Sequence, residues 1–318
     1  MGGVMEGKLK PLIYTALIAV LAYVGFAVWN GLDETLAAIS KLGLGGGVLI
    51  LSLSLVNYGL RFARWQLYLS RLGYSIPWGL SLRYYLAGFA FTTTPGKAGE
   101  AVRSLYLKRH GVAYTQSLSA FFVERLSDLA AVVLLSALGV WYFGDYIVFM
   151  VLSVALVVLL ILVLQSHQAR GFLRDKLVTK LPDRLARPAG HALNTMEAAS
   201  SLLTPRLLWG GLGLGLLAWG AEGIAFYVIL ALMDLPATFI AGVGIYSLGV
   251  TVGALSFLPG GLGSTEAVMI LLLLALGVGQ ADAGAAVILC RLATLWFAVI
   301  IGAGVLLGLE QPQRVSQA

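Results

Sequence analysis

Charged residues are scarce in this 318-residue chain. Asp, Glu, Lys and Arg make up 11% of it, whereas 59% of the residues are hydrophobic, and the mean hydropathy is +0.90. No soluble domain needs so much apolar surface, and several windows exceed the ~18 apolar residues that suggest a membrane span. The composition therefore excludes a soluble protein and predicts an all-α polytopic membrane protein with a single integral membrane domain over 1–318.

Cysteine is almost absent, and the common catalytic and nucleotide-binding motifs are missing. The one cysteine, Cys290, cannot form an internal disulfide and lacks metal-ligand partners. There is no Walker loop, no Gly-x-Ser-x-Gly and no zinc spacing. We therefore expect no enzymatic activity, no cofactor and no metal. The formal charge of +6 reports membrane orientation rather than a nucleic-acid partner.

Proline and glycine occur inside apolar runs, in two matched segments. Thr94–Val102 and Leu258–Val268 both contain Pro-Gly-x-x-Gly, and in both Glu-Ala-Val follows. An arginine then lies 25 positions after each glutamate. We interpret the chain as a duplicated broken-helix unit, with a first repeat over 44–140 and a second over 207–309. Two ordinary helix kinks are the alternative, which the matched flanks disfavour.

The apolar runs also predict the helices. Full spans are expected at 12–30, 44–69, 117–140, 146–164, 207–233 and 283–309, with a short loop at 33–41. Residues 80–91 are too few to cross ~30 Å of hydrocarbon at ~1.5 Å per residue. We therefore expect 80–91 with 98–107, and 237–257 with 265–277, to be re-entrant hairpins. The N-terminus resembles a signal sequence, but its apolar run is long and no Ala-x-Ala site follows, so a retained first helix is expected.

Residues 165–206 are the one long polar segment. They predict a cytoplasmic connector of amphipathic surface helices, broken at Pro182 and Pro188. Apart from five membrane-embedded cations and Lys41, all Lys and Arg fall on one side if both Pro-Gly segments are re-entrant. This asymmetry predicts cytoplasmic termini and two inverted repeats, an architecture typical of transporters. If one Pro-Gly segment crosses fully, the asymmetry is lost.

Ionisable residues in the predicted membrane segments are the main functional signal. Each costs at least ~2.5 kcal/mol at a helix centre, so they must face one another or a water-filled cavity. The basic members are Arg61, Arg64, Lys97, Arg125 and Arg291, and the acidic members are Glu100, Glu124, Asp128, Glu222 and Glu266. The exposed backbone of the Pro-Gly loops needs the same cavity. The loops add Pro95, Gly96, Gly99, Pro259, Gly260, Gly261 and Gly263 to the candidate substrate-binding residues.

We expect the glutamates to hold the loops in shape, to cap the half-helices or to pair with arginine. Arg61, Arg64, Arg125 and Arg291 would then be left to attract phosphate, for which arginine is suited. The alternative is that buried Arg–Glu pairs only lock the two repeats together. Lys97 has its own alternative, in which its long chain extends to the interface.

Four motifs resemble the flippase-like family, which includes the transmembrane region of lysyl-phosphatidylglycerol synthases. They are Arg61-x-x-Arg64-Trp65, Pro95-Gly96-Lys97-Ala98-Gly99-Glu100-x-x-Arg103, Glu124-Arg125-x-x-Asp128 and Leu258-Pro259-Gly260-Gly261-Leu262-Gly263-x-x-Glu266. The resemblance covers about 12–309 and adds Arg103 to the candidate site. It implies lipid translocation without naming the lipid. The family's soluble aminoacyl-transferase domain is lacking here, so we do not expect lysyl-phosphatidylglycerol synthesis.

The resulting hypothesis is a transporter that moves an anionic lipid between leaflets without ATP hydrolysis. Its substrate would be a phospholipid, a glycolipid or a polyprenyl-phosphate-linked sugar in a bacterial or archaeal cytoplasmic (inner) membrane. One alternative is a scaffold that presents lipid to a lipid synthase or glycosyltransferase through the connector. Another is a membrane enzyme that uses Glu124 and Asp128 as an acid/base pair. A homo-oligomer is compatible with each.

Overall fold

The computed structural model describes residues 14–310 except 16, 26–27, 29–31 and 175–181. These residues form helices joined by short turns, with no strand among them. Five of the described helical stretches are long and apolar enough to cross a membrane, which confirms the predicted all-α, multi-pass class. They are α2 (Leu32–Arg71), α5 (Tyr114–Phe143), α6 (Ile147–Gln165), α9 (Pro205–Leu232) and the continuous stretch Gln280–Leu309.

The N-terminal part differs from the sequence-based expectation at one point. The predicted first span at 12–30 is helical at 14–15, 17–25 and 28, and its other residues lie outside the described ones. The predicted loop at 33–41 is wrong, because α2 already begins at Leu32 and its acidic residues lie in the favourable first turn. The chain bends at Gly43 instead, where φ is 60° and ψ is 176°, a conformation that glycine adopts without a Cβ clash.

Two helices break at the Pro-Gly segments, as the sequence predicts. α3 (Trp78–Phe89) leads through a turn into the 3-10 helix η1 (Pro95–Val102) and then α4 (Arg103–Leu107). α10 (Phe239–Leu255) leads into η5 (Pro259–Gly261) and then α11 (Ser264–Ala275). In each unit the proline stands at the start of the 3-10 turn, where its missing N–H leaves no unpaired donor.

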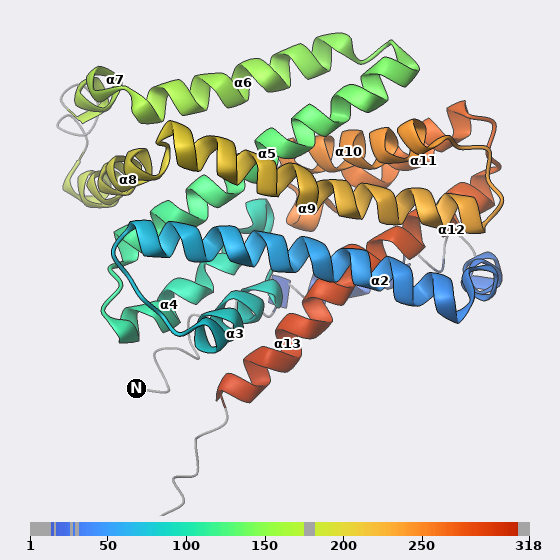
Figure 1. The fold of residues 1–318 in the computed structure, drawn as a ribbon, viewed down its shortest axis with the longest axis horizontal. Coiled ribbons are helices and arrows are strands. Elements are labelled where there is room, and N and C mark those ends of the chain that lie inside the picture. Colours follow the sequence, from blue (N-terminus) through green and yellow to red (C-terminus); the bar gives the residue numbers. More distant parts are fainter. Residues whose placement is uncertain (1–13, 16, 26–27, 29–31, 175–181, 311–318) are drawn as a thin grey trace, which may run out of the picture.

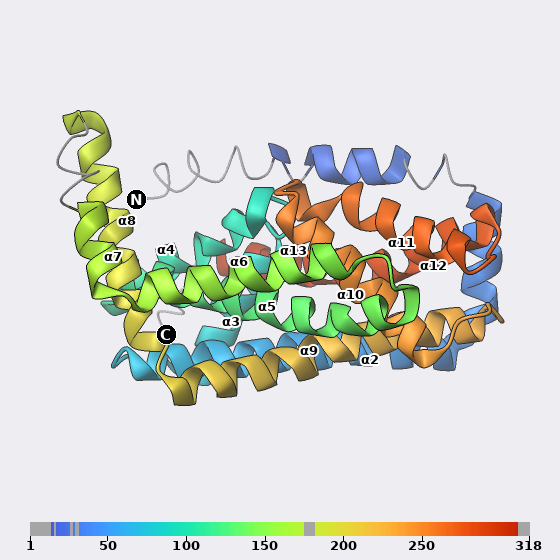
Figure 2. The same ribbon diagram turned by 90° about the horizontal axis from the view of Figure 1, so that it is seen from above.

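The tips of these two broken units meet inside the bundle. A Cβ built on Gly260 would lie 3.3 Å from the Cα of Thr93. α3 and α4 lie toward the end of the molecule that also holds α7 and α8, whereas α10 and α11 lie toward the opposite end (Figures 1 and 2). The two units therefore approach the middle from opposite ends of the long axis.

The C-terminal helical stretch, Gln280–Leu309, departs from regular α-helical geometry at the middle of the bundle. α12 (Gln280–Arg291) passes through a π-helical turn, η6 (Leu292–Trp296), into α13 (Phe297–Glu310). π-Helical turns are rare and occur frequently at functional sites. This turn begins directly after Arg291, which is a candidate site residue.

Glycines allow α5 and α10 to pack backbone against backbone. A Cβ on Gly244 of α10 would lie 2.5 Å from the Cα of Gly139 in α5. The apolar core around this contact includes Val140 of α5 and Leu248 of α10. The close approach brings the α10 tip to the middle of α5, where the predicted charges lie.

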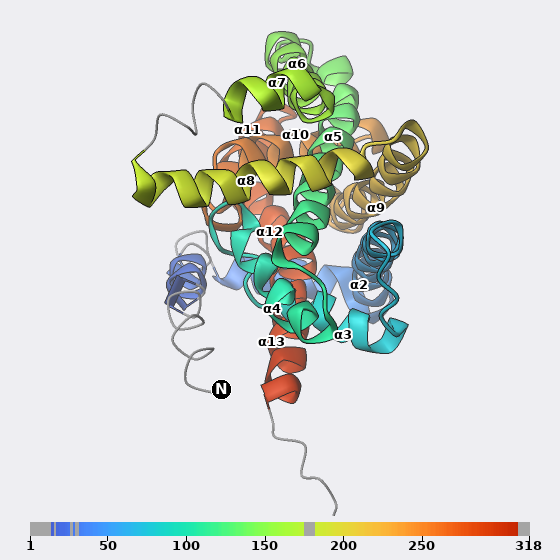
Figure 3. The same ribbon diagram turned by 90° about the vertical axis from the view of Figure 1, so that its left-hand side faces the viewer.

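The polar connector lies across one end of the bundle (Figure 3). It contains α7 (His167–Phe172) and α8 (Asp183–Leu202), separated by 175–181, which lie outside the described residues. Pro182 is the N-cap of α8, as expected of a break. The predicted break at Pro188 is wrong, because α8 continues through it. Pro188 is only in the second turn of α8, so it removes one hydrogen bond near the helix start.

Candidate functional site

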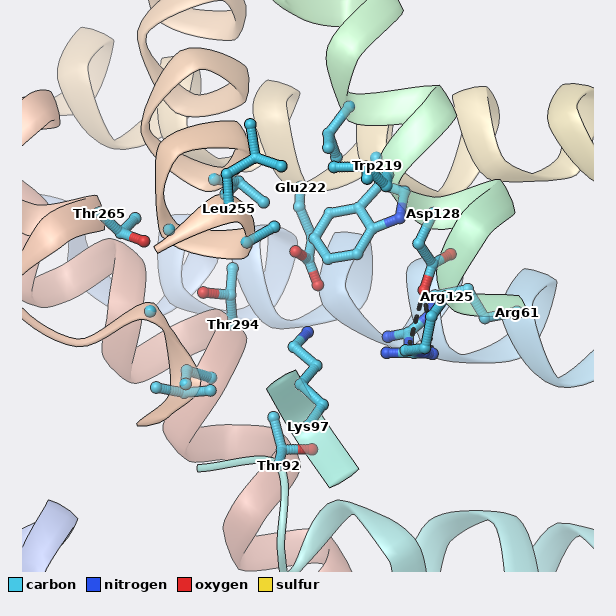
Figure 4. A pocket seen from close by; sticks show the side chains of 18 of the residues that line it. Arg61, Thr92, Lys97, Arg125, Asp128, Trp219, Glu222, Leu255, Thr265 and Thr294 are labelled. Atoms are coloured by element: carbon cyan, nitrogen blue, oxygen red, sulfur yellow. Dashed lines mark ion pairs between the residues drawn. The ribbon is translucent and has the colours of Figure 1, made fainter. Parts of the chain in front are cut away.

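A cavity of about 550 Å³ lies in the middle of the bundle, where the two broken tips meet. Its polar wall comes from five parts of the chain that are far apart in sequence (Figure 4). The charged side chains that line it are Arg61 of α2, Lys97 of η1, Arg125 and Asp128 of α5, Glu222 of α9 and Arg291 of α12. Such groups are stable inside a membrane protein only when they face one another or a polar cavity.

The opening of this cavity is apolar. Among the described residues that line the cavity, the exposed ones are all apolar. These five residues, which we call the lateral portal, are Phe122, Leu156, Ala254, Phe257 and Leu258. Leu156 lies near the middle of α6 (Ile147–Gln165), far from either helix end. In a membrane that α6 spans, the lateral portal therefore lies at the depth of the hydrocarbon core.

Four arginines and three carboxylates form a buried network beside the cavity. Arg125 lies at its centre, with Nη2 2.9 Å from Glu124 Oε1 and 2.9 Å from Asp128 Oδ2, and Nη1 3.5 Å from Glu100 Oε2. The other ion pairs are Arg103–Glu124, Arg64–Asp128 and the three that Arg61 makes with Asp128, Glu124 and Glu100. We call these seven residues the arginine–carboxylate network. It contains one more cation than anion.

Of the four arginines in the network, Arg61 has the longest distance to its nearest carboxylate oxygen. Its Nη2 lies 3.3 Å from Asp128 Oδ2 and 3.8–4.0 Å from Glu124 and Glu100. Arg61 Nε and Nη2 have no hydrogen-bond partner among the described residues, although Arg61 is only 4% exposed. The guanidinium lies between two rings, 5.4 Å from Trp219 and 5.7 Å from Phe89, which stabilise a cation that has lost water.

The network is also held by neutral groups. The Tyr85 hydroxyl donates to Glu124 Oε1 at 2.7 Å, and the Thr92 hydroxyl donates to Glu100 Oε1 at 2.7 Å. Thr92 belongs to the turn between α3 and η1, so this bond ties the first tip to the network. Buried carboxylates with several donors are stabilised in their ionised form.

The second broken unit has a separate ion pair. Arg291 Nε donates to Glu266 Oε1 at 2.7 Å, and Arg291 Nη2 donates to the carbonyl of Gly260 at 2.6 Å. Glu266 Oε2 accepts from the backbone N–H of Gly263 at 2.7 Å. Glu266 therefore caps the start of α11, which satisfies an unpaired N–H of the helix end. Arg291 joins this cap to the Pro-Gly loop.

Lys97 and Glu222 face each other across the cavity (Figure 4). The Lys97 Nζ lies 5.2 Å from the centre of the Trp219 ring. Its backbone φ is 57°, in the left-handed region that lysine rarely adopts and that recurs at functional sites. Glu222 is 3% exposed, and its Oε2 accepts from the Tyr246 hydroxyl.

The structure brings some of the predicted site residues to the cavity and places others behind it. Eight of them line the wall: Arg61, Lys97, Arg125, Asp128, Glu222, Gly260, Gly261 and Arg291. Nine others do not line it: Arg64, Pro95, Gly99, Glu100, Arg103, Glu124, Pro259, Gly263 and Glu266. Gly96 lies outside the residues whose burial the structure describes. Most of this second group supports the first through the ion pairs and turns above.

The expectation that four arginines are left free for phosphate is wrong in part. Arg64 is fully buried, pairs with Asp128 and donates to the carbonyl of Gly211 at 3.3 Å. Arg125 and Arg291 each hold a carboxylate within 2.9 Å. Buried guanidinium groups need anionic partners, and the nearby carboxylates supply them. Arg61, whose nearest carboxylate oxygen is 3.3 Å away, and Lys97, which makes no ion pair of 4.0 Å or less within the described residues, are the cations on the cavity wall with the weakest anionic contacts.

Several wall residues were not found from the sequence. Trp219 of α9 is 6% exposed, and no described residue forms a hydrogen bond with its indole Nε1. Thr92, Tyr58 and Tyr246 also line the cavity. Three positions separate Trp219 from Glu222 in an otherwise apolar run, which puts both on one helix face. That spacing is the signal that could have found Trp219.

The described residues hold no group of three or more His, Cys, Asp or Glu side chains arranged for a metal ion. What the cavity offers chemically is a set of hydrogen-bond donors and cations behind an apolar opening. Such a site suits a molecule with an anionic polar part and an apolar part, because only the polar part has partners inside.

Comparison with known proteins gives the family. The model of the lysylphosphatidylglycerol synthase transmembrane region matches residues 13–302. A UPF0104 membrane protein of Methanothermobacter thermautotrophicus is 24% identical over 312 residues, which cover 91% of this chain and 91% of that protein. A UPF0104 membrane protein of Pyrococcus horikoshii is 22% identical over 331 aligned positions, covering 94% of this chain and 96% of that protein.

These relatives are named only as membrane proteins, and their names give no activity. The family match spans the cavity, both broken tips and the arginine–carboxylate network, and it confirms the resemblance carried by the motifs. This chain belongs to the family of the lysylphosphatidylglycerol synthase transmembrane region.

Proposed function

We propose that this protein moves an anionic lipid between the two leaflets of a membrane without hydrolysing ATP. One observation carries the proposal: a cavity with a cationic wall has an opening whose exposed residues are all apolar. A water-soluble anion has no polar route through the lateral portal. A lipid enters with its head group toward Arg61 and Lys97, while its tail stays in hydrocarbon beside Leu156 and Phe257.

The distribution of charge supports an orientation for this movement. The end of the bundle that holds α7 and α8 carries Arg71, Lys108, Arg109, Arg174 and Arg206. At the opposite end, where α9 ends and α12 begins, the charged residues are Asp33, Glu34, Lys41, Asp145, Asp234 and Asp282. Basic residues collect on the cytoplasmic side of membrane proteins. We therefore infer that the α8 end is cytoplasmic and that the membrane is the cytoplasmic membrane.

With this orientation, the two broken units are re-entrant hairpins of opposite direction. The α3–η1–α4 unit dips in from the cytoplasmic side and the α10–η5–α11 unit from the outside. The first repeat at 44–140 and the second at 207–309 are then inverted copies, joined by the connector at 165–206. Inverted repeats with broken helices that meet at the midplane serve alternating access in transporters.

The test is lipid movement in vesicles that contain the purified full chain. Tail-labelled phosphatidylglycerol is added symmetrically, and a membrane-impermeant reductant then bleaches the outer leaflet. Protein-containing vesicles are expected to lose nearly all fluorescence, whereas protein-free vesicles keep about half, because only movement brings inner-leaflet lipid to the reductant. If a panel of anionic phospholipids and polyprenyl-phosphate sugars behaves as in protein-free vesicles, the transport proposal fails. A scaffold that presents lipid to a synthase or glycosyltransferase would then be favoured.

A further inference from the structure

Glu222 and Lys97 are opposite charges on facing walls that do not pair with each other. No ion pair of 4.0 Å or less involves either side chain within the described part of the chain. Within the part of the chain that the structure describes, Glu222 makes one side-chain hydrogen bond, which its Oε2 accepts from the Tyr246 hydroxyl. Oε1 therefore remains available toward the cavity. Both side chains point into the space between them (Figure 4).

A separated pair of charges needs a polar group between its members. Opposite charges attract strongly where water is scarce, and a buried charge without a partner is costly. In this cavity the carboxylate accepts hydrogen bonds and the ammonium donates them. A bound group that bridges them must therefore present an anionic acceptor to Lys97 and a hydrogen-bond donor to Glu222.

The wall around Lys97 is arranged for the anionic part of such a group. Arg61 and Trp219 both line the cavity, and the Trp219 ring lies beside the Lys97 ammonium. Arg61 Nη2 has no hydrogen-bond partner within the described part of the chain. A guanidinium N–H and an ammonium both donate and neither accepts, so Arg61 and Lys97 suit the oxygens of a phosphate.

The balance of charges around the cavity limits the net negative charge of the bound ligand. With every group ionised, the cations around the cavity are Arg61, Arg64, Lys97, Arg103, Arg125 and Arg291, and the carboxylates are Glu100, Glu124, Asp128, Glu222 and Glu266. The cations exceed the carboxylates by one. A ligand with a net charge of −1 neutralises this excess, whereas a phosphomonoester or a diphosphate would leave uncompensated negative charge.

We propose that the cavity selects a lipid phosphodiester whose distal head group carries a hydroxyl. The phosphodiester lies against Lys97, Trp219 and Arg61, and the hydroxyl donates to Glu222 Oε1. Glycerol and sugar head groups share this chemistry. A head group that ends in ammonium also donates, but its positive charge cancels that of the phosphate and leaves the excess cation without compensation. The inference rests on the proposed function only in taking the ligand to be a lipid.

The test measures binding, which is separate from movement. Purified full-length protein in detergent is titrated with short-chain phosphatidylglycerol, phosphatidylmethanol and phosphatidylethanolamine, and bound lipid is counted by native mass spectrometry. Phosphatidylmethanol has the same charge as phosphatidylglycerol but no hydroxyl. Phosphatidylglycerol is expected to bind at least about tenfold more tightly than phosphatidylmethanol, which is the scale of one hydrogen bond to a buried charge.

Variants of Glu222 assign this preference to its carboxylate. Glu222→Leu is expected to abolish the preference, measured as the ratio of the two affinities, because it removes the carboxylate that accepts from the hydroxyl. It also leaves one more cation without compensation, so the affinity for phosphatidylmethanol should rise to equal or exceed that for phosphatidylglycerol. Glu222→Gln keeps the shape and one acceptor, so it should retain a preference of about threefold, and it covers the case in which Glu222→Leu does not fold. Equal binding of phosphatidylglycerol and phosphatidylmethanol by the wild type, or tighter binding of phosphatidylethanolamine, overturns the inference. Absence of lipid movement with this preference intact overturns only the proposed transport.

Discussion

Glu266 and Arg291 lie 25 positions apart in the chain, and their side chains form an ion pair of 2.7 Å. Glu100 and Arg125 have the same spacing and also pair, at 3.5 Å. In both cases the glutamate follows a Pro-Gly tip and the arginine belongs to the next long helix. Each pair therefore fastens one broken tip to a continuous helix of the bundle.

Removing one partner of the second pair should loosen the Pro259–Gly261 tip. In Arg291→Met, Glu266 keeps only its bond from the Gly263 N–H, and the Gly260 carbonyl loses its donor. Leaving a buried carboxylate unpaired costs about 3–5 kcal/mol. We expect a clearly lower unfolding temperature in detergent, measured by intrinsic fluorescence.

The matched control for this prediction is the double variant Glu266→Gln with Arg291→Met. It removes the unpaired charge, so it should be more stable than Arg291→Met alone, by roughly 1–3 kcal/mol of coupling between neighbouring sites. Stabilities that simply add would show that the pair does not hold the tip.

The pairing of these residues could be predicted from sequence because it depends on a repeated spacing. Matched Pro-Gly segments with matched glutamates and arginines indicated two broken helices, and both helices break at the expected residues. The sequence could not show which arginines are covered by neighbouring helices and which one reaches the cavity. Arg61 and Arg64 are three positions apart on α2, so they share one broad helix face. Only the packing of α5 and α9 shows that Arg64 is covered and that Arg61 reaches the cavity.

Arg61 and Arg64 should therefore respond differently to the same substitution. Arg61→Gln leaves every carboxylate of the arginine–carboxylate network with another arginine, so we expect a folded protein with at least about tenfold slower lipid movement. Arg64→Gln removes bonds to Asp128 and to the Gly211 carbonyl, so it should mainly lower the unfolding temperature. The vesicle assay and detergent unfolding distinguish the two. Equal loss of movement at equal stability would contradict the assignment of Arg61 to the cavity.

The contact between α5 and α10 provides a test of the packing. In Gly244→Ala the new methyl group would lie 2.5 Å from Gly139 Cα, so the helices must separate, at a cost of about 1–3 kcal/mol. Gly213→Ala in α9 has no atom within 4 Å of the new methyl and should be neutral or stabilise the helix by up to ~1 kcal/mol. Unfolding temperatures in one detergent compare the two. A tolerated Gly244→Ala would show that the α5–α10 contact is looser than described.

The lateral portal can be narrowed without touching a charge. Leu156 is 38% exposed and lines the cavity, whereas Leu152 is 64% exposed, lies one turn earlier on α6 and does not line it. Leu156→Trp should slow lipid movement several-fold, because the larger ring occupies the path of the lipid tail. Leu152→Trp adds the same ring on the outer face and should leave the rate unchanged. Equal rates for both variants would argue against entry through the portal.

The lateral portal and the uncharged part of the cavity wall could not be predicted from the sequence for a physical reason. α6 is apolar except for Ser153 and the terminal Gln165, so no pattern distinguishes Leu156 from its apolar neighbours. Tyr246 occurs in a run that predicts a helix but not the residues that the helix contacts. The charged residues could be found because burial makes each of them costly, whereas an apolar residue in a membrane helix gives no such signal.

The most direct test of the account is to locate a bound head group. Purified protein is irradiated with phosphatidylglycerol that carries a photoreactive group on its glycerol head, digested and mapped by mass spectrometry. If the head group binds in the cavity, the labelled peptides contain Lys97, Trp219 or Glu222, and unlabelled phosphatidylglycerol suppresses the labelling. Labelling confined to the outer face of α6 around Leu152, with none on those three residues, would contradict it.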